Sequence, residues 1–243
     1  MSTGSLVLHR GGWEATKADL AAVPVPSETD SYVPVPHGRF VEEVELHVPR
    51  FGLTITDARY ALARDGLQMF GVLTCTNGGN HPDYALAIGL RNSYDRSLSA
   101  GLVAGSRVFC CDNLAFSGEA GASRKHTINV FRDLPDLIYR MLSKVSGMQS
   151  RIHAEIAAMK ERQLSPETAD HLMVEAIRRG VIPASQLPLV MEAWNRPPHP
   201  EFRPDTAWSL FNAFTEVSKS RSPRVQMESG LRLSSTFRSA LAL

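Results

Sequence analysis

The feature that most constrains the fold is a turn signal between two apolar runs. Residues 58–63 and 67–76 are largely apolar and flank the tripeptide Arg64-Asp65-Gly66. An Asp-Gly step between such runs favours a β-hairpin, because tight hairpin turns need residues that tolerate a left-handed backbone. The pattern therefore predicts two antiparallel strands joined by a short turn.

Further strand-like segments lie on either side of this hairpin. Residues 41–48 carry Val44, Leu46 and Val48 at alternate positions, which is typical of a half-buried strand. Residues 84–90 and 97–111 supply two more apolar runs. Together they predict a curved antiparallel sheet of roughly four or five strands within residues 40–112.

After Phe131 the apolar spacing changes to that of helices. Apolar residues recur at helical spacing from Leu134 to Val145 and again from Ile152 to Met159. Ser165-Pro166 predicts a helix start, and Gly180 after two arginines predicts its end. Asp205-Thr206 predicts the start of another helix.

These patterns define an α+β fold, a curved antiparallel sheet with hairpins followed by a helical C-terminal half. Residues 1–38, with prolines at 24, 26, 34 and 36, predict an N-terminal helix and a proline-rich arm. Residues 39–243 are expected to form a single α+β domain, with the sheet over 40–118 and the helical part over 131–243.

The composition favours a cytoplasmic protein. No apolar run approaches the ~18 residues that span a bilayer, and the first ten residues lack the apolar core of a secretory signal. Cys75, Cys110 and Cys111 are too few for a disulfide framework and fit free thiols in a reducing compartment. We expect Cys110 and Cys111 to be structural, one buried and one facing the polar edge.

The net charge of +1 hides an uneven distribution. Residues 1–49 hold three Lys or Arg and seven Asp or Glu, whereas residues 219–243 hold five basic residues and one acidic residue. The basic tail can follow a phosphate backbone or dock on the acidic N-terminal segment. The sequence leaves both open.

The first polar cluster is Arg91, Asn92, Ser93 and Asp95. Arg91 could clamp a phosphate or carboxylate while Asn92 and Ser93 donate hydrogen bonds to it. Alternatively these residues form a tight turn in which Arg91 pairs with Asp95.

The second polar cluster is Cys110, Cys111, Asp112 and Asn113. A cysteine nucleophile with His126 as its base is one interpretation, but buried cysteines are usually inert. Adjacent cysteines lack zinc-site spacing, so no metal site is expected. If the protein is an enzyme, Asp95 and Asp112 could bind Mg²⁺.

The third polar cluster is Arg124, Lys125 and His126, just before a helical stretch. It resembles a phosphate-contact loop, and the alternative is a solvated loop beside Glu119. Strands 84–90 and 102–111 should pair and end at the same edge. We therefore expect Arg91, Asn92, Asp95, Asp112, Asn113 and His126 to meet, with Arg107 on the same side.

Several motifs together resemble a family of phage- and plasmid-borne proteins catalogued as a domain of unknown function. The motifs are Pro34-Val-Pro-His37, Asp65-Gly-Leu-Gln-Met-Phe-Gly71, Gly89-Leu-Arg-Asn-Ser-Tyr-Asp95, Arg107-Val-Phe-Cys-Cys-Asp-Asn-Leu-Ala-Phe-Ser-Gly118, Arg124-Lys-His-Thr127 and Ala207-Trp-Ser-Leu-Phe-Asn-Ala-Phe-Thr-Glu-Val217. Where that family often carries His, this chain has Tyr94, so a role that needs the imidazole is not available here. The resemblance implies work on mobile elements: DNA replication, recombination, or the contest between phage and host.

Three functions follow as hypotheses. The first is a non-catalytic nucleic-acid-binding accessory of mobile elements, similar in role to single-strand annealing proteins, using Arg91, Asn92, Ser93, Arg107, Arg124, Lys125 and His126. The second is an enzyme acting on a nucleotide or phosphorylated small molecule, with Asp95, Asp112, Asn113 and His126 in acid–base or metal roles. The third is a protein-binding factor in phage–host conflict.

No P-loop, G-x-G-x-x-G, H-E-x-x-H or G-x-S-x-G motif is present, which favours a non-catalytic protein without a cofactor. No membrane partner is expected, and a homo-oligomer stays open.

Overall fold

The computed structural model describes residues 12–77, 84–108, 114–221 and 223–242, and it confirms the α+β class. Six antiparallel strands form one sheet in the order β1-β2-β3-β4-β5-β6, so each strand pairs with the next along the chain. The strands are β1 (Gly12–Ala15), β2 (Thr54–Ala63), β3 (Gln68–Thr76), β4 (Tyr84–Ser93), β5 (Ala100–Val108) and β6 (Leu114–Arg124).

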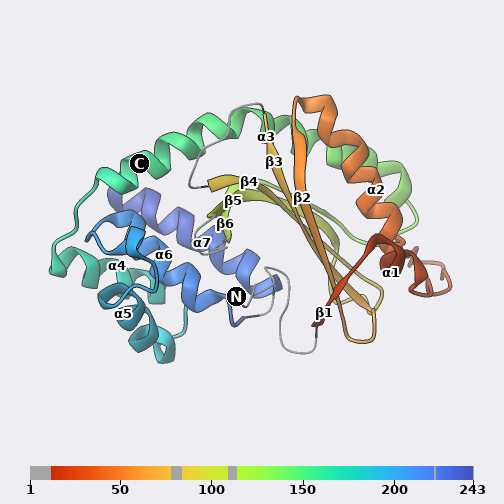
Figure 1. Cartoon of the computed structure of the whole chain (residues 1–243). Helices are drawn as coiled ribbons and strands as arrows, with labels where there is room; N and C mark the ends of the chain where they lie inside the picture. The colour runs from red at the N-terminus through yellow and green to blue at the C-terminus, as the bar shows by residue number, and fades with distance from the viewer. Residues whose placement is uncertain (1–11, 78–83, 109–113, 222, 243) are drawn as a thin grey trace.

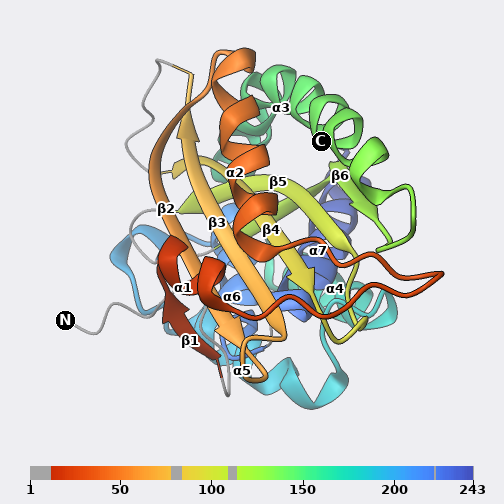
Figure 2. The same ribbon diagram turned by 90° about the vertical axis from the view of Figure 1, so that its right-hand side faces the viewer.

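Helices precede the hairpins and dominate after residue 130. They are α1 (Lys17–Ala22), α2 (His37–His47), α3 (Val130–Glu161), α4 (Pro166–Arg178), α5 (Leu187–Asn195), α6 (Ala207–Ser218) and α7 (Pro223–Leu241), with short 3₁₀ turns at Val48–Phe51, Ala184–Gln186 and Pro200–Phe202. Figure 1 shows α3 arching over the sheet, from the side of α2 toward α4, α5, α6 and α7. Figure 2 shows α2 lying across the sheet, in front of β3 and β4.

The β2–β3 hairpin is confirmed, and its turn uses the expected residues. Ala63 pairs with Gln68, and Arg64, Asp65 and Gly66 between them have φ angles of 52°, 55° and 84°. These three left-handed residues reverse the chain. A Cβ on Gly66 would also lie 3.1 Å from a methyl carbon of Val23. Glycine is therefore required here both by the left-handed backbone and by this close contact.

The strand predicted at residues 41–48 is wrong, because this segment belongs to α2 and the 3₁₀ turn that follows it. Phe40, Val41, Val44 and Val48 are completely buried, at the spacing of one helical face, whereas Leu46 is 60% exposed. The alternation of Val44, Leu46 and Val48 was therefore incidental. The helical spacing that starts at Phe40 is the one the fold uses.

The predicted sheet also lacked both of its outer strands. β1 comes from the segment expected to hold only a helix and an arm, and β6 extends past residue 118 into a stretch rich in small residues. Small side chains gave no alternating apolar signal in β6. β6 is a strand because it pairs with β5, with Ala100 opposite Arg124, and its local sequence does not indicate this.

The main core lies between one face of the sheet and the helices. It is formed by buried residues of β2–β5 together with residues of α2, α3, α4 and α6, including Leu62, Met69, Leu90, Leu102, Val44, Ile138, Leu172 and Phe214. The opposite face of the sheet carries a smaller buried cluster that includes Phe70, Val72 and Ala87.

The helix boundaries predicted from caps are confirmed in the C-terminal half. The Ser165 side chain accepts a hydrogen bond from the Thr168 amide at the start of α4, and Gly180 has a φ of 67° just after its end. Thr206 caps α6 in the same way. None of the helices in the described parts of the chain is both long and apolar enough to cross a membrane.

Candidate functional site

Most of the predicted site residues gather at one end of the sheet. This sheet end is formed by the β2–β3 turn, the β4–β5 turn and residues 124–129. Gln68 pairs with Ser93, and Ala100 pairs with Arg124, so the ends of β4 and β6 lie beside the start of β5. Arg91, Asn92, Ser93, Asp95, Arg124, Lys125 and His126 all lie at or next to this sheet end.

The expected convergence with Arg107 does not occur. Arg91 pairs with Gly101 at the start of β5, whereas Arg107 pairs with Ala85 at the opposite end of the same strand. In an antiparallel hairpin the last residue of the second strand lies beside the first residue of the first strand. Six residues of extended chain therefore separate the two positions by roughly 20 Å. Cys110, Cys111, Asp112 and Asn113 lie outside the described residues.

At the sheet end, Asn92 and His126 hold the proline-rich arm. The Val33 amide donates to the backbone oxygen of His126 at 3.2 Å, and the Val35 amide donates to His126 Nδ1, also at 3.2 Å. Asn92 Nδ2 donates to the Val35 oxygen at 2.7 Å. The polar atoms of Asn92 and His126 that make these bonds are therefore occupied by the chain's own backbone.

The spacing of the prolines matches this anchoring. The amides of residues 33, 35 and 37 all donate hydrogen bonds, the last to the Tyr94 hydroxyl at 2.9 Å. Pro34 and Pro36 occupy the two alternate positions, so the N–H groups that proline lacks are not among those that anchor the arm. The arm is thus an extended segment whose hydrogen bonds run along one edge.

His37 completes a buried polar cluster next to the arm. Its side chain is fully buried, and Nε2 lies 3.0 Å from the Gly66 oxygen while Nδ1 lies 3.0 Å from Asn92 Nδ2. Because the amide nitrogen can only donate, Nδ1 accepts and Nε2 carries the proton. Burial lowers the pKa of His37 to about 4 and also lowers the pKa of His126, so both rings are neutral at pH 7.

Two atoms of this cluster remain without a partner. Asn92 Oδ1 and His126 Nε2 are buried, and no hydrogen-bond partner exists for either among the described residues. Asn92 is completely buried and His126 is 6% exposed. Neither side chain is open to a ligand from solvent, and their placement favours a structural role in holding the arm.

Ser93 and Asp95 build the β4–β5 turn. Ser93 Oγ bonds both backbone groups of Leu98, and Asp95 accepts from the Ser97 amide and from Gln68 Nε2, each at 3.0 Å. Partial burial would raise the pKa of Asp95, but hydrogen bonds from Ser97, Ser93 and Gln68 outweigh it, so the pKa is below its usual value. Asp95 also pairs with Arg64 of the neighbouring turn, at 3.5 Å.

The exposed cations of this region surround the arm. Arg96 lies over the Tyr32 ring with its Cζ 4.3 Å from the centroid, and Arg39 lies over the Phe131 ring at 4.2 Å. Lys125 is exposed next to His126. Within the described residues none of these three cations forms a salt bridge, whereas Arg124 is paired with Asp133 at 2.6 Å. We call Tyr32, Arg39, Arg96, Lys125 and Phe131 the arm surface.

Sequence reasoning missed His37, Arg39 and Arg96 as members of this region. Arg96 stands in the β4–β5 turn with a φ of 61°, one of four left-handed non-glycine residues in the described chain. An arginine inside a turn motif was visible in the sequence. Its stacking on Tyr32 was not, because Tyr32 precedes it by 64 residues.

The basic tail is a packed helix rather than a free segment. α7 packs on β6, α4 and α6. Arg221 and Arg232 donate to the backbone oxygens of Val181 and Gly180, each at 2.8 Å, and Arg238 pairs with Glu155 at 3.0 Å. These cations stabilise the helical half.

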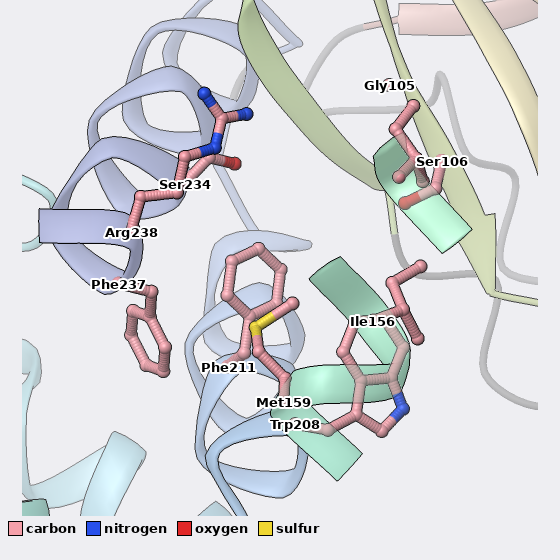
Figure 3. Close-up of a pocket in the computed structure, with 10 residues that line it drawn as sticks. Gly105, Ser106, Ile156, Met159, Trp208, Phe211, Ser234, Phe237 and Arg238 are labelled. Carbon is pink, nitrogen blue, oxygen red and sulfur yellow. The ribbon is translucent and has the colours of Figure 1, made fainter. Parts of the chain in front are cut away.

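The largely apolar gap between β5 and helices α3, α6 and α7 is part of the core. Figure 3 shows Ile156, Met159, Trp208 and Phe211 gathered around it, with Arg238 on α7 at one side. Its volume is about 30 Å³, room for roughly one water molecule. We assign no ligand to this gap.

In the described part of the chain, no group of three or more His, Cys, Asp or Glu side chains is arranged to hold a metal ion. A scan against protein-family models and searches of curated proteins and of solved structures found no match to this chain. The resemblance to mobile-element proteins therefore stays a prediction from sequence motifs.

Proposed function

We propose that this protein is a non-catalytic nucleic-acid-binding accessory of mobile genetic elements and that its arm surface contacts the nucleic acid. The observation that carries the proposal is the set of three exposed cations, Arg39, Arg96 and Lys125, around one buried anchor. The resemblance of the sequence motifs to phage- and plasmid-borne proteins supports the same assignment.

The two stacked arginines favour single-stranded nucleic acid. A guanidinium that lies flat on an aromatic ring keeps its N–H donors directed outward at its edges, where they can bind phosphate oxygens. Its outer face can stack on an unpaired base, as guanidinium planes do in single-strand recognition. Lys125 adds a cation without a directional requirement.

The near-neutral net charge limits the strength of this interaction. With a net charge of +1, binding depends on the arm surface rather than on the field of the whole molecule. Three phosphate contacts to a single strand correspond to a slope of about −2 in a plot of log K against log salt. We therefore expect weak binding at physiological salt and clear binding at low salt.

The test is fluorescence anisotropy with a labelled oligothymidylate and a duplex of equal length, over a range of salt concentrations. Arg39→Gln, Arg96→Gln and Lys125→Gln should each weaken single-strand binding and reduce the slope by about 0.7. Arg140→Gln is the matched control, because Arg140 is also exposed but pairs with Asp136 on α3 at 2.6 Å. Absence of salt-dependent binding at low salt, or equal losses in Arg140→Gln and the three variants, would overturn the proposal.

A further inference from the structure

A cavity of about 190 Å³ lies between α4 and α5, in the helical half of the chain. Figure 1 shows these two helices on the side of the molecule away from α1 and α2. Each helix supplies two lining residues three positions apart, a spacing that places them on one helical face. The side chains that line the cavity include Asp170 and Met173 of α4, Met191 and Trp194 of α5, and Leu164 and Asp205.

Backbone pairing holds the two lining residues that lie outside the helices. The segments that precede α4 and α6 meet in a short antiparallel bridge between Gln163 and Thr206. Beside this bridge, the Leu164 amide donates a hydrogen bond to the Asp205 oxygen at 2.9 Å. Leu164 and Asp205 therefore lie next to each other, and the backbone fixes the position of Asp205 at the cavity.

Within the described residues, the two carboxylates of the cavity have no partner. Asp170 and Asp205 are exposed, and neither side chain forms a hydrogen bond or an ion pair with the described parts of the chain. The described residues that line the cavity include no Lys, Arg or His. The two negative charges are thus available to a cationic ligand that enters from solvent.

Most of the remaining lining is apolar. Leu164 and Met173 are buried, Trp194 is partly buried, and Met191 is 40% exposed. Such side chains favour contact with methylene groups, and the face of an indole ring also attracts a cation. A hydrated metal ion would gain nothing from these apolar side chains. An alkyl chain that carries positive charge would gain from both the carboxylates and the apolar lining.

The volume of the cavity favours a short chain. A water molecule occupies about 30 Å³ in the liquid, so the cavity of about 190 Å³ has room for roughly six groups of that size. Pockets for drug-sized ligands are larger and begin at roughly 300 Å³. A chain of about four methylene groups with an amino group at each end has the matching size.

We propose that this cavity binds a short aliphatic diamine. One ammonium group binds Asp170 and the other binds Asp205, while the methylene chain packs against Met173 and Trp194. The two carboxylates balance both positive charges of a diamine, whereas a monoamine would leave one carboxylate unpaired. The inference is independent of the nucleic-acid proposal, because it uses no residue of the arm surface.

The test is a fluorescence titration of the full-length chain with 1,4-diaminobutane at pH 7 and constant ionic strength. Binding beside Trp194 should give a saturable change in indole emission, and Trp194→Phe should remove most of that change. n-Butylamine has one charge and butane-1,4-diol has none, so each should bind at least about threefold more weakly than the diamine. Magnesium chloride at the same ionic strength should give no saturable change.

Asp170→Asn and Asp205→Asn should each weaken the binding of 1,4-diaminobutane by about threefold to fivefold. Both variants should keep the wild-type circular dichroism and melting temperature, because neither carboxylate bonds to the described parts of the chain. Glu42→Gln is the matched control, since it removes the same charge from an exposed position on α2 and should bind as the wild type does.

Four outcomes would overturn the proposal. They are the absence of a saturable change with 1,4-diaminobutane, equal affinity for n-butylamine, tighter binding of Mg²⁺ than of the diamine, and wild-type affinity in both Asp variants.

Discussion

The imidazole of His37 stacks on the phenol ring of Tyr94, with centroids 3.9 Å apart and planes inclined by 13°. The Tyr94 hydroxyl also accepts the hydrogen bond of the His37 amide, the first N–H of α2. Pro36, at the N-cap position, has no side chain that could do this. A residue of the β4–β5 turn thus caps a helix that begins 57 residues earlier in the chain.

Tyr94→Phe should destabilise the protein by about 1–3 kcal/mol, because it leaves the buried His37 amide without its acceptor. Urea unfolding followed by circular dichroism measures the change. Tyr139→Phe is the control, since Tyr139 is 54% exposed and its loss of a hydroxyl should cost less than about 0.5 kcal/mol. Equal effects of the two substitutions would show that Tyr94 does not cap α2.

The stability of the protein should fall between about pH 6.5 and pH 4. Burial lowers the pKa of His37 to about 4, so in this range the unfolded chain binds a proton at this residue that the folded chain does not. The stabilisation is complete above pH 6.5 and is lost as the pH falls through 4. Its size is on the order of 3 kcal/mol, and urea unfolding at pH 7 and pH 5 measures part of it.

The contribution of His37 to this pH dependence can be separated by substitution. His37→Gln should reduce the loss of stability between pH 7 and pH 5, whatever its own cost at pH 7. His171→Gln removes an exposed histidine and should leave the loss unchanged. The assignment fails if His37→Gln keeps the full wild-type difference.

Phe237→Ala should destabilise the fold by about 3–5 kcal/mol, the usual cost of truncating a buried phenylalanine. Phe237 of α7 is 1% exposed and meets the Phe211 and Phe214 rings edge-on, at 5.2 and 6.1 Å. Leu189→Ala, at a position 56% exposed, should change little. Thermal unfolding of both variants tests whether the basic tail is part of the folded unit, and a wild-type melting temperature for Phe237→Ala would contradict this.

Cys75 should react slowly with iodoacetamide in the folded protein. Its side chain is 1% exposed, and burial raises the pKa of the thiol to about 12, so very little thiolate is present at pH 8. Peptide mapping by mass spectrometry compares labelling of this residue in buffer and in urea. Labelling at the same rate in both would show that Cys75 is accessible.

Turn and helix-capping residues predicted local structure correctly, because their own backbone preferences favour particular conformations. Asp65-Gly66 predicted the β2–β3 hairpin, and Ser165-Pro166 with Gly180 predicted both ends of α4, because each depends only on backbone preferences of the residues themselves. The change from alternating to helical spacing likewise predicted the α+β class.

Features that depend on tertiary packing could not be predicted from the local sequence. The segment around Val44 fits both a strand and a helix, and only the burial of Phe40 and the exposure of Leu46 distinguish them. The position of Arg107 at the far end of β5 follows from antiparallel pairing, and the sequence analysis overlooked this consequence.

The sequence predicted the location of the candidate site better than it predicted the role of the site's residues. Asn92 and His126 were expected to meet a ligand, yet they bind the backbone of Val35. No local pattern indicates that Val35, which lies 57 residues before Asn92 and 91 residues before His126, occupies both. The polar character that indicated a site is the same character that buried backbone anchoring requires.

The six-stranded meander ends in two different ways. At one margin β1 pairs along only four residues of β2, and at the other α7 and α3 lie against β6. Because β1 covers only the last four residues of β2, the half from Thr54 to Arg59 is left uncovered by β1. If a strand from another copy of the chain extends this sheet, it will add beside that half of β2.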